Sequence, residues 1–318
     1  MVFLKAITVM ATTVHGADTD RYPSGPVRAI VPYAPGGGTD IIARQLSARL
    51  TERWGHALVI DNRAGAATVI GTELAARATP DGYTLLITTG THAVNATLVK
   101  KLPFDPVKSF DPITLLGTAA NVLVVHPSMP AKTVKEFVAL AKSRPGNMNY
   151  SSSGNGGTGH LAMEMLKLAA DVNIAHIPYK GAGPAVTALV AGEVVTSITN
   201  LIAAMPMVKA HRMRVIAVTS GKRSIALPDV PTVAEAGYAG FDASGWFAVY
   251  APAKAPRQII ARLNEDFRYV LRLADVQQGL AAQGAEASGS SPEELAKWTA
   301  SELERWRRVL AAANIKPD

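Results

Sequence analysis

The sequence predicts an α/β fold of two units, joined by two crossing segments, with a ligand cleft between the units. One observation is that short β-branched runs alternate with amphipathic runs along most of the chain, as strands alternate with helices in α/β proteins. A second is that 48% of the 318 residues are apolar and 18% are charged, which is typical of globular proteins. A chain of this length forms one large or two medium domains.

The first strand and helix are predicted on either side of a glycine loop, residues 35–40. A β-branched run at residues 28–33 precedes the loop, and apolar residues at helical spacing follow it from Ile42 to Trp54. Free amides at a helix N-terminus attract anions, so the loop is a candidate anion site, with Thr39 as the predicted helix cap. A tight turn without a ligand is the alternative. The candidate ligand-binding residues here are Gly36, Gly37, Gly38, Thr39 and Asp40.

The next elements continue the alternation. Residues 58–60 are predicted to form a strand, residues 70–78 a helix and residues 84–89 a further strand. This strand runs into Gly90-Thr91-His92, which predicts a loop. Because strand ends line the ligand crevice of open α/β sheets, Thr89 and Thr91 are candidate ligand-binding residues.

Extended runs at residues 113–116 and 122–125 predict the first crossing between the two units. A second β/α series follows. We expect its strands at 148–150, 174–177, 194–198 and 214–218, and its helices at 134–142, 160–170, 184–191 and 202–210. The run 245–250 predicts the return strand. The tail is predicted to be helical, and Ser290 or Ser291 caps a last helix that starts at Pro292.

A second glycine loop, residues 151–160, follows a strand of the second series. Its glycines match the spacing of a dinucleotide-binding loop, but the next strand ends in Pro178-Tyr179-Lys180, without the acidic residue that holds a ribose. The loop instead offers hydroxyl and amide donors, which suit a carboxylate. For His160 the alternative is packing or capping, and for Lys180 a solvated turn. The candidate ligand-binding residues of this series are Ser152, Ser153, Gly154, Gly157, Thr158, His160, Lys180 and Asn200.

Other classes of protein are excluded by what the sequence lacks. The formal net charge is +7, but Lys and Arg do not cluster with aromatic residues, so we expect no nucleic-acid partner. The absence of cysteine excludes disulfides, thiolate metal sites and a cysteine nucleophile. No Gly-x-Ser-x-Gly or Walker motif occurs, and His160 has no second histidine at ligand spacing. We therefore expect no catalytic residue, no metal and no cofactor.

Residues 1–20 are predicted to be a secretory signal segment. Lys5 precedes an apolar stretch that begins at Ala6, and small residues near Gly16 offer a cleavage site. An unprocessed, irregular N-terminus is the alternative. No other segment approaches the ~18 uninterrupted apolar residues of a membrane span.

Several motifs, in this order along the chain, carry a resemblance to a known family. They are VPYAPGGGTD at 31–40, PDGYTL at 80–85, DPI at 111–113, SSGNG at 152–156, HL at 160–161, PYKG at 178–181, AVTS at 217–220 and LPDVPTVAEAG at 227–237. With these motifs the chain resembles the extracytoplasmic solute receptors of the tripartite tricarboxylate transporters, the Bug family.

The resemblance implies a periplasmic receptor with a two-domain, type II-like periplasmic-binding-protein fold that closes like a Venus flytrap on a small carboxylate. It places the ligand contacts at residues 36–40 and 152–158, through amides, hydroxyls and bridging waters. We expect domain 1 to comprise residues 21–121 and 248–318, and domain 2 residues 122–247. The expected partners are a small organic acid and the membrane permease subunits, and we expect a monomer.

The chain departs from the family pattern at two places. The sequence Gly65-Ala66-Ala67-Thr68 stands where the family has Gly-Ala-Gly-Gly. Ala67 and Thr68 therefore place side chains where glycine residues would expose only their backbone to the pocket. The strand after Gly192-Glu193 lacks the acids that are frequent there, which favours a plain acid over an amino-bearing ligand, with Asp40 as the remaining ammonium partner. We therefore predict a solute-binding receptor and not an enzyme. The alternatives are an α/β enzyme acting on a small carboxylate and a receptor-like sensor for a signalling partner.

Overall fold

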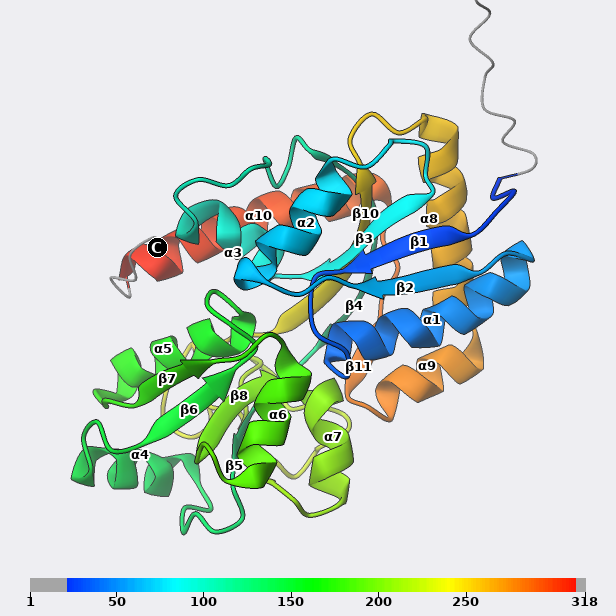
Figure 1. The fold of residues 1–318 in the computed structure, drawn as a ribbon. Helices are drawn as coiled ribbons and strands as arrows, with labels where there is room; N and C mark the ends of the chain where they lie inside the picture. The colour runs from blue at the N-terminus through cyan, green and yellow to red at the C-terminus, as the bar shows by residue number, and fades with distance from the viewer. Residues whose placement is uncertain (1–21, 313–318) are drawn as a thin grey trace, which may run out of the picture.

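The computed structural model describes residues 22–312, which form two β-sheets with helices on the faces of each (Figure 1). The predicted signal segment, residues 1–20, lies outside the described residues. Strands and helices alternate along most of the chain, so the predicted α/β class is confirmed.

The first sheet has six strands in the order β11-β4-β10-β3-β1-β2. β1 is parallel to β2 and β3, whereas β10 is antiparallel to β3 and β4. The strands are β1 (Val27–Val31), β2 (Leu58–Asn62), β3 (Thr84–Thr89), β4 (Phe110–Ala119), β10 (Gly245–Pro252) and β11 (Ala285–Ala287).

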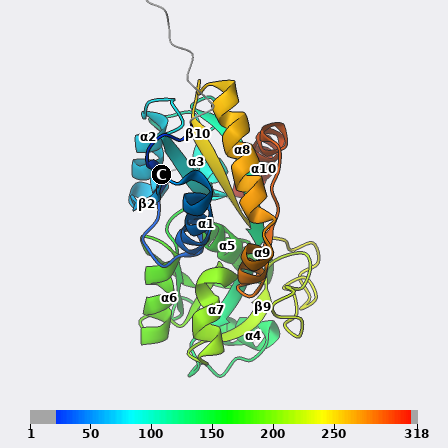
Figure 2. The ribbon, with the colours of Figure 1, turned by 90° about the vertical axis from the view of Figure 1, so that its right-hand side faces the viewer.

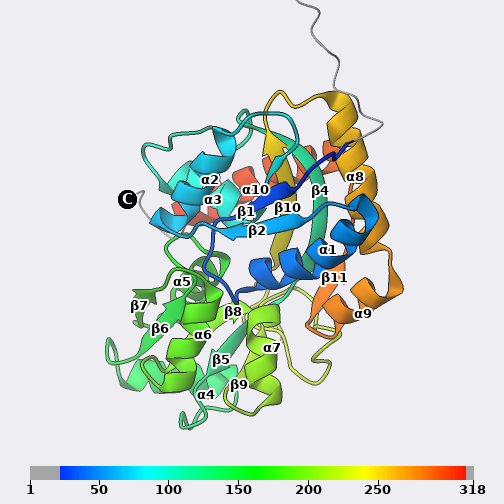
Figure 3. The ribbon, with the colours of Figure 1, turned by 45° about the vertical axis from the view of Figure 1, so that its right-hand side comes forward.

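Both faces of the first sheet are buried. On β1, Ala29 and Val31 pack into one apolar cluster while Ile30, between them, packs into another, as the two-residue period of a strand requires. One face is covered by α1 (Gly38–Trp54), α8 (Arg257–Leu271) and α9 (Ala274–Ala281), seen together in Figure 3. The other is covered by α2 (Val69–Ala76), α3 (Thr91–Leu98) and α10 (Pro292–Ala312).

The second sheet has five strands in the order β7-β6-β8-β5-β9. They are β5 (Asn121–Val125), β6 (Asn149–Ser152), β7 (Ala175–Pro178), β8 (Thr196–Asn200) and β9 (Arg214–Val218). α4 (Val134–Ser143) and α5 (Thr158–Ala170) pack on one face, and α6 (Ala182–Ala191) and α7 (Leu201–Lys209) on the other. Below, each sheet with its helices is called the first or the second unit.

The chain crosses between the units twice. β4 ends at Ala119 and β5 begins at Asn121, and the chain returns between the end of β9 at Val218 and the start of β10 at Gly245. Figure 2 shows the two units one above the other. The domain boundaries expected above, residues 21–121 with 248–318 and residues 122–247, remain a proposal; β10 pairs with β4 from Gly245 onward.

Two local predictions were wrong. α1 begins at Gly38 with Gly37 as its N-cap, two residues before the predicted cap Thr39, so Thr39 lies inside the helix and does not cap it. Gly90-Thr91-His92, expected as a loop, leads directly into α3.

Of the two predicted caps of the last helix, Ser290 and Ser291, the structure shows Ser291 in this role. Its hydroxyl oxygen accepts a hydrogen bond from the Glu294 amide at 3.1 Å, and its own amide donates to the Glu294 carboxylate at 2.7 Å. This reciprocal pair is a capping box. The Ser290 hydroxyl instead accepts from the amide of Leu115 on β4, which ties the start of α10 to the first sheet.

Candidate functional site

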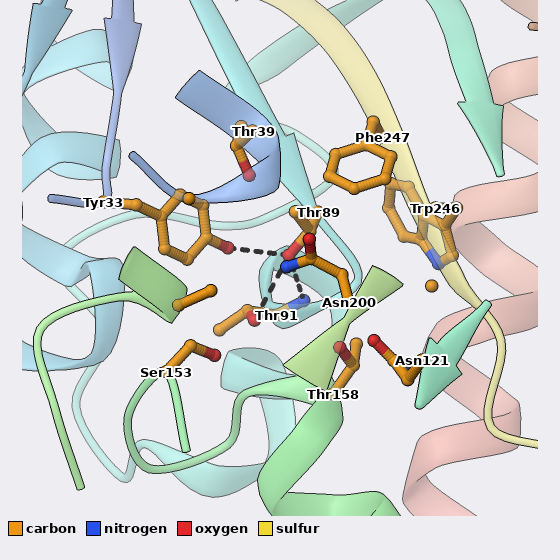
Figure 4. Close-up of a pocket in the computed structure, with 13 residues that line it drawn as sticks. Tyr33, Thr39, Thr89, Thr91, Asn121, Ser153, Thr158, Asn200, Trp246 and Phe247 are labelled. Atoms are coloured by element: carbon orange, nitrogen blue, oxygen red, sulfur yellow. Dashed lines mark hydrogen bonds between the residues drawn. The ribbon is translucent and has the colours of Figure 1, made fainter. Parts of the chain in front are cut away.

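Side chains from both units surround a small cavity between them (Figure 4). It is lined by Tyr33, Gly37, Thr39, Thr89, Thr91, Asn121, Ser153, Thr158, Ala182, Asn200, Gly245, Trp246 and Phe247. The cavity has a volume of about 30 Å³, which is room for about two waters. The oxygens of one carboxylate group need a similar space.

Five helices begin at this cavity. Gly37 is the N-cap of α1 and Asn200 is the N-cap of α7, while Thr91, Thr158 and Ala182 are the first residues of α3, α5 and α6. The first amides of a helix have no partner within the helix, and its N-terminus is the positive end of the helix dipole. Five such ends around one cavity favour an anion without a charged side chain.

The polar side chains of the lining are neutral. They are Tyr33, Thr39, Thr89, Thr91, Asn121, Ser153, Thr158 and Asn200. Within residues 22–312, no Lys, Arg, Asp or Glu side chain contributes to this lining. Hydroxyls and amides therefore supply the hydrogen bonds to whatever the cavity holds.

In the first glycine loop, Asp40 is turned to its own neighbours. Its carboxylate accepts hydrogen bonds from the Gly36 amide and from the Arg44 guanidinium, each at 3.0 Å. Burial alone would raise the pKa of Asp40, but these hydrogen bonds outweigh it, and the pKa lies below its ordinary value. Asp40 is thus an ionised, paired residue that stabilises the start of α1, and it leaves Gly37 and Thr39 to line the cavity.

The second glycine loop is hydrogen-bonded to two histidines that stack on each other. Ser153 reaches the cavity, whereas the Ser152 hydroxyl lies 2.6 Å from Nε2 of His176. The His176 ring stacks on His160 with 4.1 Å between ring centroids. The Gly156 amide donates to Nδ1 of His160 at 3.1 Å. His160 therefore contacts the loop through Gly156 and packs against His176, in agreement with the packing role that was the alternative to ligand binding.

The cavity brings together about half of the residues predicted from the sequence. Those in its lining are Gly37, Thr39, Thr89, Thr91, Ser153, Thr158 and Asn200. Those outside its lining are Gly36, Gly38, Asp40, Ser152, Gly154, Gly157, His160 and Lys180. Lys180 is exposed, and its carbonyl accepts a hydrogen bond from the Ala34 amide at 3.0 Å. Ala66, Ala67 and Thr68 form a 3₁₀ turn, η2, and also lie outside the lining.

Sequence reasoning did not name six of the lining residues. They are Tyr33, Asn121, Ala182, Gly245, Trp246 and Phe247. Asn121 and Gly245 each begin a strand at a crossing between the units. A segment that crosses between two units passes the cleft, so its position in the sequence could have indicated that these two residues line the cavity. Tyr33 follows the first strand, and its hydroxyl lies 2.7 Å from that of Thr89.

Two α/β units joined by two crossings, with a small polar cavity between them, have the architecture of a protein that binds a small molecule. The chain belongs to the receptor family of the tripartite tricarboxylate transporters, whose model matches residues 42–315. Members of this family are periplasmic solute-binding receptors and not enzymes, and the resemblance seen in the sequence is thereby confirmed. None of the helices within residues 22–312 combines the length and apolar composition that a membrane span requires.

The chain is similar over nearly its whole length to individual members. It is 37% identical to the protein BugT of Bordetella pertussis, over 93% of this chain and 92% of that protein. A solved periplasmic transporter is 41% identical to this chain, and Rpa4515 of R. palustris, solved with adipate, is 36% identical. Each of the two structures superposes with a TM-score of 0.91, and each comparison covers 93% of this chain and 100% of the other chain. MatC of Rhodopseudomonas palustris with bound malate is 31% identical, with a TM-score of 0.87, covering 91% of this chain and 100% of its own.

Proposed function

We propose that this receptor binds a small organic acid, with one carboxylate in the cavity, and presents it as a monomer to the membrane permease subunits of its transporter. The observation that carries the proposal is the convergence of five helix N-termini on a cavity lined by neutral hydrogen-bonding groups. Two structural relatives hold adipate and malate, and both ligands are carboxylic acids.

The magnitudes support binding without a cation. Each helix N-terminus favours an anion by ~0.3–1 kcal/mol, and each hydrogen bond to a charged group contributes ~1.5–3 kcal/mol. Micromolar affinity corresponds to ~8 kcal/mol. Three hydrogen bonds to a carboxylate, together with the five helix ends, reach that range before the remainder of the ligand makes any contact.

A thermal-shift screen of the purified receptor tests this function. Mono-, di- and tricarboxylic acids are compared with neutral sugars and with amines. We expect at least one acid to raise the melting temperature, since saturation at a hundredfold excess over Kd adds ~2.7 kcal/mol to the free energy of unfolding. Stabilisation by a sugar or an amine, with no response to any acid, would overturn the proposal.

A further inference from the structure

Asn121 gives the cavity an unused hydrogen-bond acceptor. It is the first residue of β5, at the first crossing between the units, and it lines the cavity. The residue is 1% exposed, and its Oδ1 has no hydrogen-bond partner in the part of the chain that the structure describes. Figure 4 shows this oxygen directed toward Thr158 and the space between the labelled side chains.

The orientation of the Asn121 amide is set by its surroundings. Its Nδ2 donates to the carbonyl of Ala243 at 2.8 Å. A carbonyl oxygen only accepts, so the nitrogen has to face Ala243 and the oxygen has to face the cavity. The Thr219 hydroxyl lies 3.0 Å from the same carbonyl and 3.2 Å from the backbone carbonyl oxygen of Asn121, so its single proton goes to one of these two acceptors at a time.

Asn121 therefore differs from the rest of the polar lining. The hydroxyls of the lining can rotate to donate to a carboxylate. The other amide of the lining, Asn200, uses its oxygen to accept from the Ala203 amide at 2.9 Å. Oδ1 of Asn121 can do nothing but accept, and a carboxylate oxygen beside it would be repelled. A buried acceptor left without a donor is costly, so a ligand that brings a donor to this place is favoured over one that does not.

The lining limits which donor that is. An ammonium group would call for a nearby carboxylate, and within residues 22–312 none lines the cavity, since Asp40 is paired with Arg44. A hydroxyl group is a neutral donor that needs no such partner. We propose that Asn121 is a specificity-determining residue, whose Oδ1 accepts a hydrogen bond from a hydroxyl next to the bound carboxylate, so that the receptor prefers hydroxy acids to the corresponding plain acids. This inference rests on the proposed function.

The test compares pairs of acids that differ in one hydroxyl. Isothermal titration of the wild-type receptor is carried out with each enantiomer of malate against succinate, each enantiomer of 2-hydroxyglutarate against glutarate, citrate against tricarballylate, and adipate as a longer plain acid. We expect a hydroxy acid to bind at least about tenfold more tightly than its plain partner, since a site with a buried acceptor rejects the analogue that lacks the donor.

The variant Asn121→Leu connects the preference to this residue. It replaces the amide by an apolar side chain of similar size, so it should bring the affinities of a hydroxy acid and of its plain partner close to each other. Thr219→Val is the matched control, because it removes a second donor to the Ala243 carbonyl but does not line the cavity. This control should keep the wild-type ratio of affinities. The ratio is read within one variant, so a general loss of stability does not imitate the effect.

The outcomes separate this inference from the proposed function. Plain acids that bind as tightly as their hydroxy partners would overturn the role of Asn121, with a water then satisfying Oδ1, and would leave the receptor function intact. An equal loss of preference in Asn121→Leu and Thr219→Val would also overturn it. If none of these acids binds and sugars or amines do, the proposed function itself fails.

Discussion

At the scale of single residues, Ser153 and Lys180 distinguish two ways of holding an anion. Ser153 contributes a hydroxyl to the cavity, whereas Lys180 is exposed outside its lining. Ser153→Val removes a donor and adds bulk, so we expect a loss of affinity of at least about tenfold, equivalent to ~1.4 kcal/mol. Lys180→Met should weaken binding by less than that, because exposed charges interact weakly with their surroundings.

Isothermal titration of both variants with the same acid measures the difference. The melting temperature of each ligand-free variant is the control for folding. Binding that is abolished in Lys180→Met and retained in Ser153→Val would show that a cation holds the ligand.

His92 links stability to pH. It is 1% exposed; its Nε2 donates to the Pro106 carbonyl at 2.7 Å, and its Nδ1 has no partner among the described residues. Burial lowers the pKa of His92 from 6.5 to about 4. Between these values the unfolded chain binds a proton that the folded chain does not, so the free energy of unfolding falls on acidification, by up to ~1.4 kcal/mol per pH unit. Burial also lowers the pKa of His176, to about 3, so His176 likewise lowers the free energy of unfolding as the pH falls.

The variant His92→Phe should reduce this dependence. It keeps a ring against Phe110 and Tyr250, whose ring centroids lie 5.1 and 5.0 Å from that of His92, but it does not titrate. Urea unfolding across about pH 4 to 6.5 should give a shallower slope, on top of a loss of about 1 kcal/mol at every pH from the missing hydrogen bond. The same slope in variant and wild type would contradict the assignment to His92.

At the scale of elements, the start of α1 has to come close to the start of α7. A Cβ atom at Gly38 would overlap the side-chain oxygen of Asn200 and lie 2.9 Å from its Cγ. Gly38→Ala should therefore weaken ligand binding at least about tenfold, although alanine favours the helix by roughly 1 kcal/mol. At Gly25, outside the cavity lining, a Cβ would meet no atom within 4 Å, so Gly25→Ala is the control for a glycine-to-alanine change and should bind normally. Equal affinities of the two variants in titration calorimetry would refute this role of Gly38.

The elements that were predicted well have strong local patterns. Residues 214–218 form β9 over the predicted range, and the start of α10 follows from Pro292 and the Ser291 cap, because each signal is complete within a few residues. α3 was missed because it has 8 residues and begins directly after Gly90, so a turn and a helix start cannot be told apart there.

The site was predicted only where a strand end carries a local signal. The two glycine loops contain Gly37 and Ser153, whereas Trp246 and Phe247 were predicted only as part of the return strand, residues 245–250. The orientation of the Asn121 amide depends on Ala243, 122 residues away. Which side of an amide faces a cavity is set by such distant partners, and no local sequence pattern contains that information.

At the scale of the whole molecule, the two units meet around a cavity of about 30 Å³. The loops of the two units are in direct contact, since the Ala34 amide donates to the Lys180 carbonyl at 3.0 Å. A di- or tricarboxylate is larger than the cavity, so we expect it to enter while the units are apart. The short connection at Ala120 and the segment between β9 and β10 are the places where the chain can bend.

Ligand should therefore make the receptor more compact in solution. Small-angle scattering of the ligand-free protein is expected to give a larger radius of gyration than scattering with a saturating acid, because contacts with both units stabilise the closed arrangement. Gly38→Ala should show a smaller decrease at saturation than the wild type, since its added methyl group obstructs the approach of α1 to Asn200. Identical scattering curves with and without a ligand that titration calorimetry shows to be bound would mean that the units do not move, and that the acid enters through a gap in a rigid molecule.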